Sequence, residues 1–181
     1  MTGIATFLLS CMRESARDTR GVAAVEFALG TLVLAVGLLN VADIGLYVYT
    51  RMEVDYASQM GAQAAWKTCN DQTTMLPATQ KCTGLNTVIT TSIQSTTLGA
   101  SVSLPAGSPS ENYYCINASN ALQVVGSLNS PPSDCSAAGN PGLRPGDYLL
   151  VQVNYSYAPL FPGVSVMSAS TISRTSWVRL K

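Results

Sequence analysis

The 181-residue chain has equal numbers of basic and acidic residues, and only 11% of its residues are charged. A chain of this kind lacks the basic field that nucleic acid binding requires, so we expect no nucleic acid partner. Histidine is absent, which removes the Ser/His/Asp and Cys/His nucleophile pairs and most zinc sites other than all-cysteine ones. Catalysis by a pair of carboxylates remains possible in principle, but the acidic residues are scattered and form no recurring motif. We therefore expect no enzyme and no cofactor.

Residues 1–20 begin weakly apolar and end polar, with three arginines near the end of the segment. Positive charge directly before a membrane helix keeps that flank in the cytoplasm. A secretory signal would have the reverse order, with its basic residues before its apolar core. Residues 8–11, Leu-Leu-Ser-Cys, loosely resemble a lipoprotein box, yet no basic region precedes them. Both readings are disfavoured.

A charge-free apolar run extends from Phe27 to Ala42, and residues 22–25 in front of it are also apolar. Together they approach the roughly 20 residues that span a bilayer as a helix. The sequence therefore predicts a transmembrane helix over residues 22–43. A carboxylate, Glu26, lies near its beginning, where a charge costs less than the roughly 2.5–3.5 kcal/mol expected at the centre. Its presence still needs a reason.

A specific combination of residues surrounds the start of the apolar run. It consists of glycine at position 21, a small apolar residue at 22, glutamate five positions after the glycine and an aromatic residue next to that glutamate. It resembles the prepilin peptidase site of the type IV pilin superfamily. More narrowly, RGVAAVEFAL is similar to the TadE-like minor pilins, or pseudopilins, of the tight-adherence (Tad) pilus. The resemblance implies cleavage between Gly21 and Val22, which makes residues 1–21 a cytoplasmic leader.

The resemblance also assigns roles after cleavage. Glu26 would pair with the new ammonium group of Val22 on a neighbouring subunit, and Phe27 would accompany it in assembly. The implied partners are the prepilin peptidase, other pilins, Tad assembly-platform proteins and the membrane. A type II secretion pseudopilin fits less well, because such chains normally begin Phe-Thr-Leu-Ile-Glu, whereas this one would begin Val-Ala-Ala-Val-Glu. An ordinary single-span anchor, tethering a periplasmic binding module outside any fibre, remains the alternative.

Residues 44–68 are predicted to continue the same helix as an amphipathic stem. Asp43 lies roughly 30 Å along the helix from Val22 and should reach the far interface. Tyr47 and Tyr49 fit an aromatic belt there, and Arg51 marks the emergence into water. Apolar residues then recur every four positions and predict the face that must be covered: Val48, Met52, Tyr56, Met60 and Ala64. A second set is small enough for close packing, preferably within the subunit: Ala57, Gly61, Ala62, Ala64 and Ala65.

Cys11 lies in the leader, and four cysteines remain beyond it. An even number on the exported side predicts two disulfides, for which three pairings exist. We favour the pairing of nearest neighbours, Cys69 with Cys82 and Cys115 with Cys135, because both bonds close short loops. A metal site made of all four thiolates would need a closer C-x2-C spacing, so we expect no metal.

Residues 69–181 are predicted to form an exported α+β domain. Its first part is a loop over 69–82 and a helix of roughly 84–97 capped by Gly99. Strands are expected at 100–104 and 112–117, and residues 121–128 fit either a strand or a short helix. A long loop over 129–146 precedes the clearest strand, 147–157, in which alternate residues share one buried face: Leu149, Val151, Val153, Tyr155 and Tyr157. The chain from about 165 onward is expected to form its antiparallel partner.

The predicted architecture is thus a long N-terminal helix, half in the membrane and half packed on a small antiparallel sheet, as in pilins. VQVNYSYAPLFP and the Ser/Ala/Thr-rich strand after it also resemble the C-terminal half of TadE-like domains. We expect a single-pass protein of the inner membrane, with a cytoplasmic N-terminus and a periplasmic or extracellular C-terminal domain. The implied function is that of a minor pilin in a Tad-type (Flp) pilus used for surface adhesion.

Overall fold

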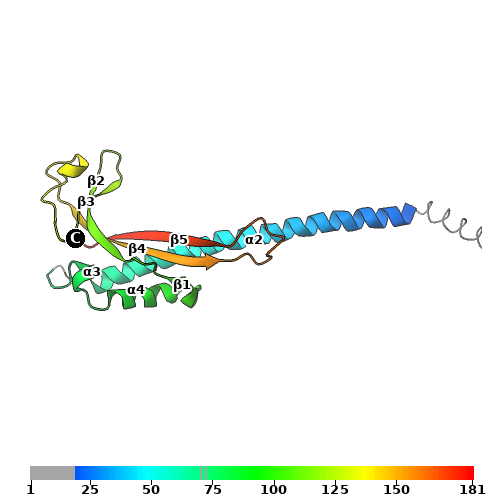
Figure 1. Cartoon of the computed structure of the whole chain (residues 1–181), viewed down its shortest axis with the longest axis horizontal. Coiled ribbons are helices and arrows are strands. Elements are labelled where there is room, and N and C mark those ends of the chain that lie inside the picture. The colour runs from blue at the N-terminus through cyan, green and yellow to red at the C-terminus, as the bar shows by residue number, and fades with distance from the viewer. Residues whose placement is uncertain (1–18, 70, 72) are drawn as a thin grey trace, which may run out of the picture.

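The computed structural model describes residues 19–69, 71 and 73–181, and one helix dominates it. Helix α2, Thr19–Thr68, has 50 residues and is therefore about 75 Å long at 1.5 Å per residue. Its first half projects away from the rest of the protein, and its second half lies along the sheet (Figure 1). The predicted continuous helix is confirmed. Most of the predicted leader, residues 1–18, lies outside the described residues.

The sheet is antiparallel and is built around one long strand. Its strands are β1 Val102–Ser103, β2 Ser110–Ile116, β3 Leu122–Gly126, β4 Gly146–Tyr157 and β5 Ser170–Arg179. β5 pairs with β4 along its full length, β1 and β2 pair with different parts of β4, and β3 pairs with β2. The ambiguous segment 121–128 is thus a strand, and the partner of β4 begins at Ser170 rather than near 165. A long helix packed on a small antiparallel sheet confirms the α+β prediction.

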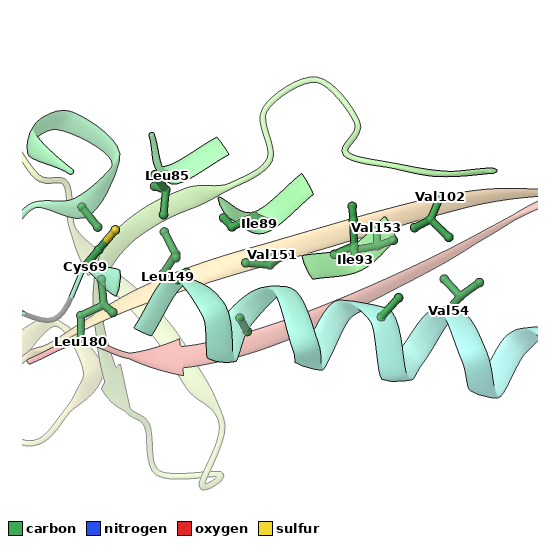
Figure 2. Close-up of a cluster of buried hydrophobic side chains, with 14 of the residues drawn as sticks. Val54, Cys69, Leu85, Ile89, Ile93, Val102, Leu149, Val151, Val153 and Leu180 are labelled. Carbon is green, nitrogen blue, oxygen red and sulfur yellow. The ribbon is translucent and has the colours of Figure 1, made fainter. Parts of the chain in front are cut away.

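The core lies between the sheet and two helices. Leu149, Val151 and Val153 alternate along β4 on one face and are fully buried, as their spacing predicted. The second half of α2 and helix α4, Leu85–Gln94, cover this face and contribute Val54, Ile89 and Ile93 (Figure 2). Burying three aliphatic side chains on one strand stabilises the fold by about 1.5–3 kcal/mol each.

The face of α2 that packs against the sheet is not the predicted one. Val48, Met52 and Tyr56 are about half exposed or more, at 49%, 66% and 53%. The covered face consists instead mainly of small residues: Val54, Ala57, Ser58, Gly61, Ala62 and Ala65. The helix axis must approach both α4 and β4, and only short side chains leave room for that. The expectation that small stem residues pack within the subunit is therefore confirmed for this face.

Gly61 marks the closest approach between α2 and its neighbours. A Cβ atom at this position would lie 2.9 Å from Cγ2 of Ile93, 3.1 Å from Cγ2 of Ile89 and 3.3 Å from Cγ1 of Val151. These methyl groups belong to β-branched side chains with few alternative rotamers in a packed core. Glycine is therefore required by packing at this position.

Helix α4 ends earlier than predicted. Its C-cap is Ser95, whose N–H donates to the carbonyls of Thr91 and Ser92, and the hydroxyls of Ser95 and Thr96 donate to nearby carbonyls. Such side-chain bonds compete with the helical pattern and favour termination. The predicted cap, Gly99, instead begins a short 3-10 helix, η1, Gly99–Ser101. The predicted loop 69–82 also contains a one-turn helix, α3, Ala78–Lys81.

Both preferred cysteine pairings are present as disulfides. Cys69–Cys82 joins the end of α2 to the segment that precedes α4, and Cys115–Cys135 joins β2 to the long loop before β4. They close segments with sequence separations of 13 and 20 residues. Each can add on the order of 3 kcal/mol by restricting the unfolded chain. The second disulfide lies in a small buried cluster of its own, separate from the main core.

We predict that Gly61→Ala destabilises the protein while Gly45→Ala does not. An alanine at either position gains the same helix propensity, but a Cβ atom at Gly45 would meet no atom within 4 Å. The difference between the two variants therefore reports overpacking, for which we expect about 1–3 kcal/mol. Thermal unfolding of both variants in the same detergent, followed by circular dichroism, measures it. Equal melting temperatures would show that α2 does not pack tightly on α4.

Candidate functional site

The predicted processing and assembly residues lie on the first turns of α2, and all of them are exposed. Val22 and Phe27 are 59% and 77% exposed, and Gly21 and Glu26 are also in the exposed class. Val22 and Glu26 are four residues apart and share one side of the helix. Since the rest of the described chain does not cover these residues, they are accessible to another molecule.

Gly21 has no packing role in the described part of the protein. A Cβ atom there would meet no atom within 4 Å, and its backbone does not adopt a positive φ. A glycine inside a helix costs about 1 kcal/mol relative to alanine. The fold therefore gives no reason for glycine at this position, in contrast to Gly61.

The apolar half of α2 is exposed along its whole length. Every residue from 21 to 38 is in the exposed class, including large aliphatic side chains such as Leu32 and Val33. The helix is long and apolar enough to cross a membrane, and it lies near the N-terminus. One such helix fits a single-pass membrane protein. The direction in which it crosses remains a prediction.

Two polar side chains near the end of the apolar run hold a distant loop. The β4–β5 loop, residues 158–169, donates the N–H groups of Leu160 and Phe161 to the carboxylate of Asp43, at 2.9 and 3.4 Å. Asn40 accepts a hydrogen bond from the N–H of Val166 at 2.6 Å and donates one to the carbonyl of Val164 at 3.1 Å. The loop is thereby fixed along the helix, where Figure 1 shows it as the trace beyond the ends of β4 and β5.

Asp43, which the sequence analysis expects at the far membrane interface, is fully buried under this loop. The Tyr157 hydroxyl donates to the carbonyl of Asp43 at 3.1 Å. Tyr47, predicted as part of an aromatic belt, packs edge-on against the Tyr157 ring with centroids 5.1 Å apart. These polar residues therefore connect the membrane half of α2 to the sheet.

An apolar stripe on the stem remains uncovered within the subunit. It consists of Val48, Met52 and Tyr56, and we call it the stem stripe. A surface hollow of about 510 Å³ beside it is lined by Val48, Met52, Arg51, Asp55 and Arg174. The stem stripe lies on the same helix as the exposed apolar half, so the two form a long surface that the described chain does not cover.

A buried pair of acids lies at the other end of the sheet. Glu111 on β2 pairs with Leu149, and Asp147 on β4 pairs with Tyr113, so the two acids are diagonal neighbours. The Glu111 carboxylate accepts hydrogen bonds from the N–H groups of Ala78 and Thr79 and from the Thr79 hydroxyl, at 2.6–2.8 Å. It thereby caps the N-terminus of α3.

Asp147 is 2% exposed, and one of its carboxyl oxygens, Oδ1, has no hydrogen-bond partner among the described residues. Burial, followed by the negative charge of Glu111, raises the pKa of Asp147 to about 7, against an opposing effect of Lys181. Neither acid lines the two hollows beside β2. The pair therefore has a structural explanation, in which one member caps a helix and the other is held close to neutral.

Comparison with known families finds a match to the TadE-like protein family model over residues 21–63. The match begins at Gly21 and includes Glu26, the apolar half of α2 and most of the stem.

Residues 21–63 are similar to this family, and we call them the TadE-like segment.

The predicted resemblance to TadE-like proteins is thus confirmed over this segment. The match covers about a quarter of the 181 residues and does not extend to β4 and β5. The likeness of the C-terminal half to TadE-like domains therefore stays a prediction. No curated protein and no solved structure matches the chain significantly.

Sequence reasoning missed the roles of Asn40, Asp43 and the two buried acids. Asn40 and Asp43 gave a signal, because a polar residue near the end of an apolar run needs a partner. Nothing in the sequence indicated that the partner is a loop more than 100 residues away. The proximity of Glu111 and Asp147 follows from the β2–β4 register, which their spacing in the sequence does not disclose.

We predict that the folded protein loses stability as the pH rises from about 4 to about 7. Asp147 is protonated in the folded state up to a pKa of about 7, whereas in the unfolded chain it ionises near pH 4. In this range the folded state binds the extra proton, so unfolding becomes easier with rising pH, by on the order of 4 kcal/mol in total. Chemical unfolding in detergent at a series of pH values measures the decline.

The Asp147→Asn variant should lose this decline, because asparagine does not titrate. Asp71→Asn is the matched control: hydrogen bonds from Thr73 and Thr74 lower the pKa of Asp71 to about 2, so its contribution changes only below pH 4. The control should therefore keep the decline between pH 4 and pH 7. If the stability of Asp147→Asn declined by the same amount between pH 4 and pH 7, the raised pKa of Asp147 would not be the cause of the decline.

Proposed function

We propose that this protein is a minor pilin of a Tad-type pilus, cut by a prepilin peptidase between Gly21 and Val22 and then incorporated during pilus assembly. The mature chain begins at Val22 and anchors in the inner membrane, with its sheet domain on the periplasmic or extracellular side. The assembled pilus serves surface adhesion. The observation that carries the proposal is that the TadE-like segment begins at Gly21 and is exposed throughout its membrane half.

The state of Gly21 supports the cleavage step. Packing within the described chain does not require glycine there, and the helix would be more stable with alanine. Gly21 thus lowers the stability of the helix and has no packing role. Its presence is explained if another molecule binds the chain at this position. A peptidase that accepts only a small residue before the cut provides this explanation.

The exposure of Glu26 supports the assembly step. Cleavage creates an ammonium group on Val22 of every subunit, and this charge is costly among apolar helices unless it is paired. Glu26 lies free on the same side of the helix. When α2 helices pack side by side, the carboxylate of one subunit can neutralise the ammonium of the next.

The uncovered surface of α2 supports incorporation into a helical bundle. The exposed residues 21–38 and the stem stripe extend along most of the helix. Lipid can cover only the membrane half, whereas the stem stripe lies beyond it. Packing against the α2 helices of other pilins covers both, which a solitary membrane-tethered binding module would not achieve.

We assign no catalytic role to the protein. Its only strongly perturbed buried acid, among the described residues, is Asp147, and the neighbouring Glu111 is engaged by α3. The chain has no histidine to act as a base near neutral pH.

We predict that Gly21→Leu blocks removal of the leader. The large side chain should not fit the site that accepts glycine, so the protein should keep its full mass in cells that contain the peptidase. Gly30→Leu is the matched control, because a Cβ atom at Gly30 also meets no atom within 4 Å. Mass spectrometry and N-terminal sequencing should find Val22 as the first residue in the wild type and the control. A wild-type protein intact from Met1 in its native host would favour the tethered module instead.

We predict that Glu26→Gln is cleaved normally but fails to enter pili. Removing one partner of a buried ion pair costs on the order of 3–5 kcal/mol, which is enough to exclude the subunit from a cooperative assembly. Glu26→Asp retains the charge and should be incorporated better than Glu26→Gln. Immunoblots of sheared pili, compared with the processed protein in membranes, measure incorporation. Equal incorporation of both variants and the wild type would contradict the proposed pairing.

A further inference from the structure

The β4–β5 loop lies beside the part of α2 that is predicted to be in the membrane. Asn40, which binds the loop at Val164 and Val166, is 18 residues beyond Val22. At 1.5 Å per residue this is about 27 Å along the helix, while the hydrocarbon core of a bilayer is about 30 Å thick. If the span begins at Val22, the loop reaches the outer edge of the hydrocarbon core.

The composition of the loop suits that position. No charged residue occurs from Ala158 to Ser173. Three of its aliphatic side chains point away from the protein: Leu160, Val164 and Val166 are 63%, 45% and 74% exposed. Single exposed aliphatic residues are common on soluble proteins. Here three such side chains lie in one uncharged loop that Asn40 and Asp43 hold beside the exposed apolar half of α2.

Several backbone N–H groups of the loop are hydrogen-bonded within the protein. Irregular backbone is tolerated at membrane depth only where its polar groups find partners in the protein. Here the N–H groups of Leu160, Phe161 and Val166 donate to the side chains of Asp43 and Asn40. The N–H groups of Val164 and Ser165 donate to the carbonyl of Phe161.

The first basic side chains after Val22 on α2, and after the β4–β5 loop on β5, lie farther from the membrane than Asn40. Arg51 on α2 is 11 residues, or about 16 Å, past Asn40 along the helix, and Arg174 on β5 lines the same surface hollow. Arginine side chains at this height can reach lipid phosphates. The apolar loop lies at the level of the acyl chains, and the two arginines lie farther out, at the level of the headgroups. This order matches the two layers of a lipid interface.

We propose that residues 158–169 form a second membrane contact, in which Leu160, Val164 and Val166 insert into the outer edge of the bilayer beside α2. The partner is the lipid itself, at the boundary between acyl chains and headgroups. Asn40 and Asp43 fix the loop to the helix, so the sheet domain rests on the membrane instead of swinging about a free stem. The contact goes beyond the proposed pilin function, because it requires neither cleavage at Gly21 nor a neighbouring subunit.

The test places a single tryptophan in the loop of the full-length protein. Trp66→Phe and Trp177→Phe remove the two native tryptophans, and Val166→Trp or Leu160→Trp adds the reporter. Each protein is reconstituted at a low protein-to-lipid ratio into phosphatidylcholine vesicles with or without acyl-chain bromination. Bromine quenches only those tryptophans that contact the acyl region. Val124→Trp is the control, since Val124 is 53% exposed on β3 at the far end of the domain.

We expect blue-shifted emission and strong quenching by brominated lipid for both loop reporters, and water-like, unquenched emission for the control. Water-like emission from both loop reporters would overturn the proposal. Blue-shifted emission that brominated lipid does not quench, and that grows with protein density, would also overturn it, because it would show contact with a second protein. Having two reporters ensures that the failure of one variant to fold does not leave the question open.

Discussion

The structure depends on the close packing of one side of α2 against the sheet and α4. At Gly61 the helix backbone lies so near Ile89, Ile93 and Val151 that no side chain fits between them. Small residues one turn to either side extend this contact. Because the same helix continues without a break to Thr19, the contact also fixes the direction in which the apolar half leaves the domain. Packing around Gly61 thus determines how the membrane anchor is presented.

The polar contacts at Asn40 and Asp43 complete this arrangement at the other end of the sheet. The core shown in Figure 2 around Val54 and Val102 continues to Tyr157 at the end of β4 and Ile172 near the start of β5, with Tyr47 and Met167 packed against it. Beyond this end of the core, hydrogen bonds from the connecting loop to two side chains of α2 hold the loop on the helix. Since neither Asn40 nor Asp43 favours an apolar medium, each must be bonded there, and the loop provides the bonds. The hydrogen bonds between them therefore explain both why the apolar helix contains two polar residues and how the uncharged loop is held beside it.

The sequence was sufficient for features that depend on local pattern. The alternation along residues 147–157 identified the buried face of β4, and the uninterrupted run after Gly21 predicted the long helix. Spacing also favoured the correct cysteine partners, since both disulfides close short segments. The end of α4 was misplaced because side-chain bonds of Ser95 and Thr96 outweigh the signal of a later glycine. The contact between Glu111 and Asp147 depends on strand register and could not be read from spacing.

The error about the stem is informative for function. The rule that large apolar residues mark the buried side of a helix selected Val48, Met52 and Tyr56, but the subunit buries the small residues instead. The rule fails when the helix must come very close to its neighbours. The large apolar residues then remain outside, where they are unfavourable for an isolated protein in water. Their position, continuous with the exposed apolar half of α2, fits the proposal that the α2 helices of other subunits cover them. Under the proposed function the two sides of α2 therefore have different roles: the small-residue side packs within the subunit, and the large-residue side packs against other pilins.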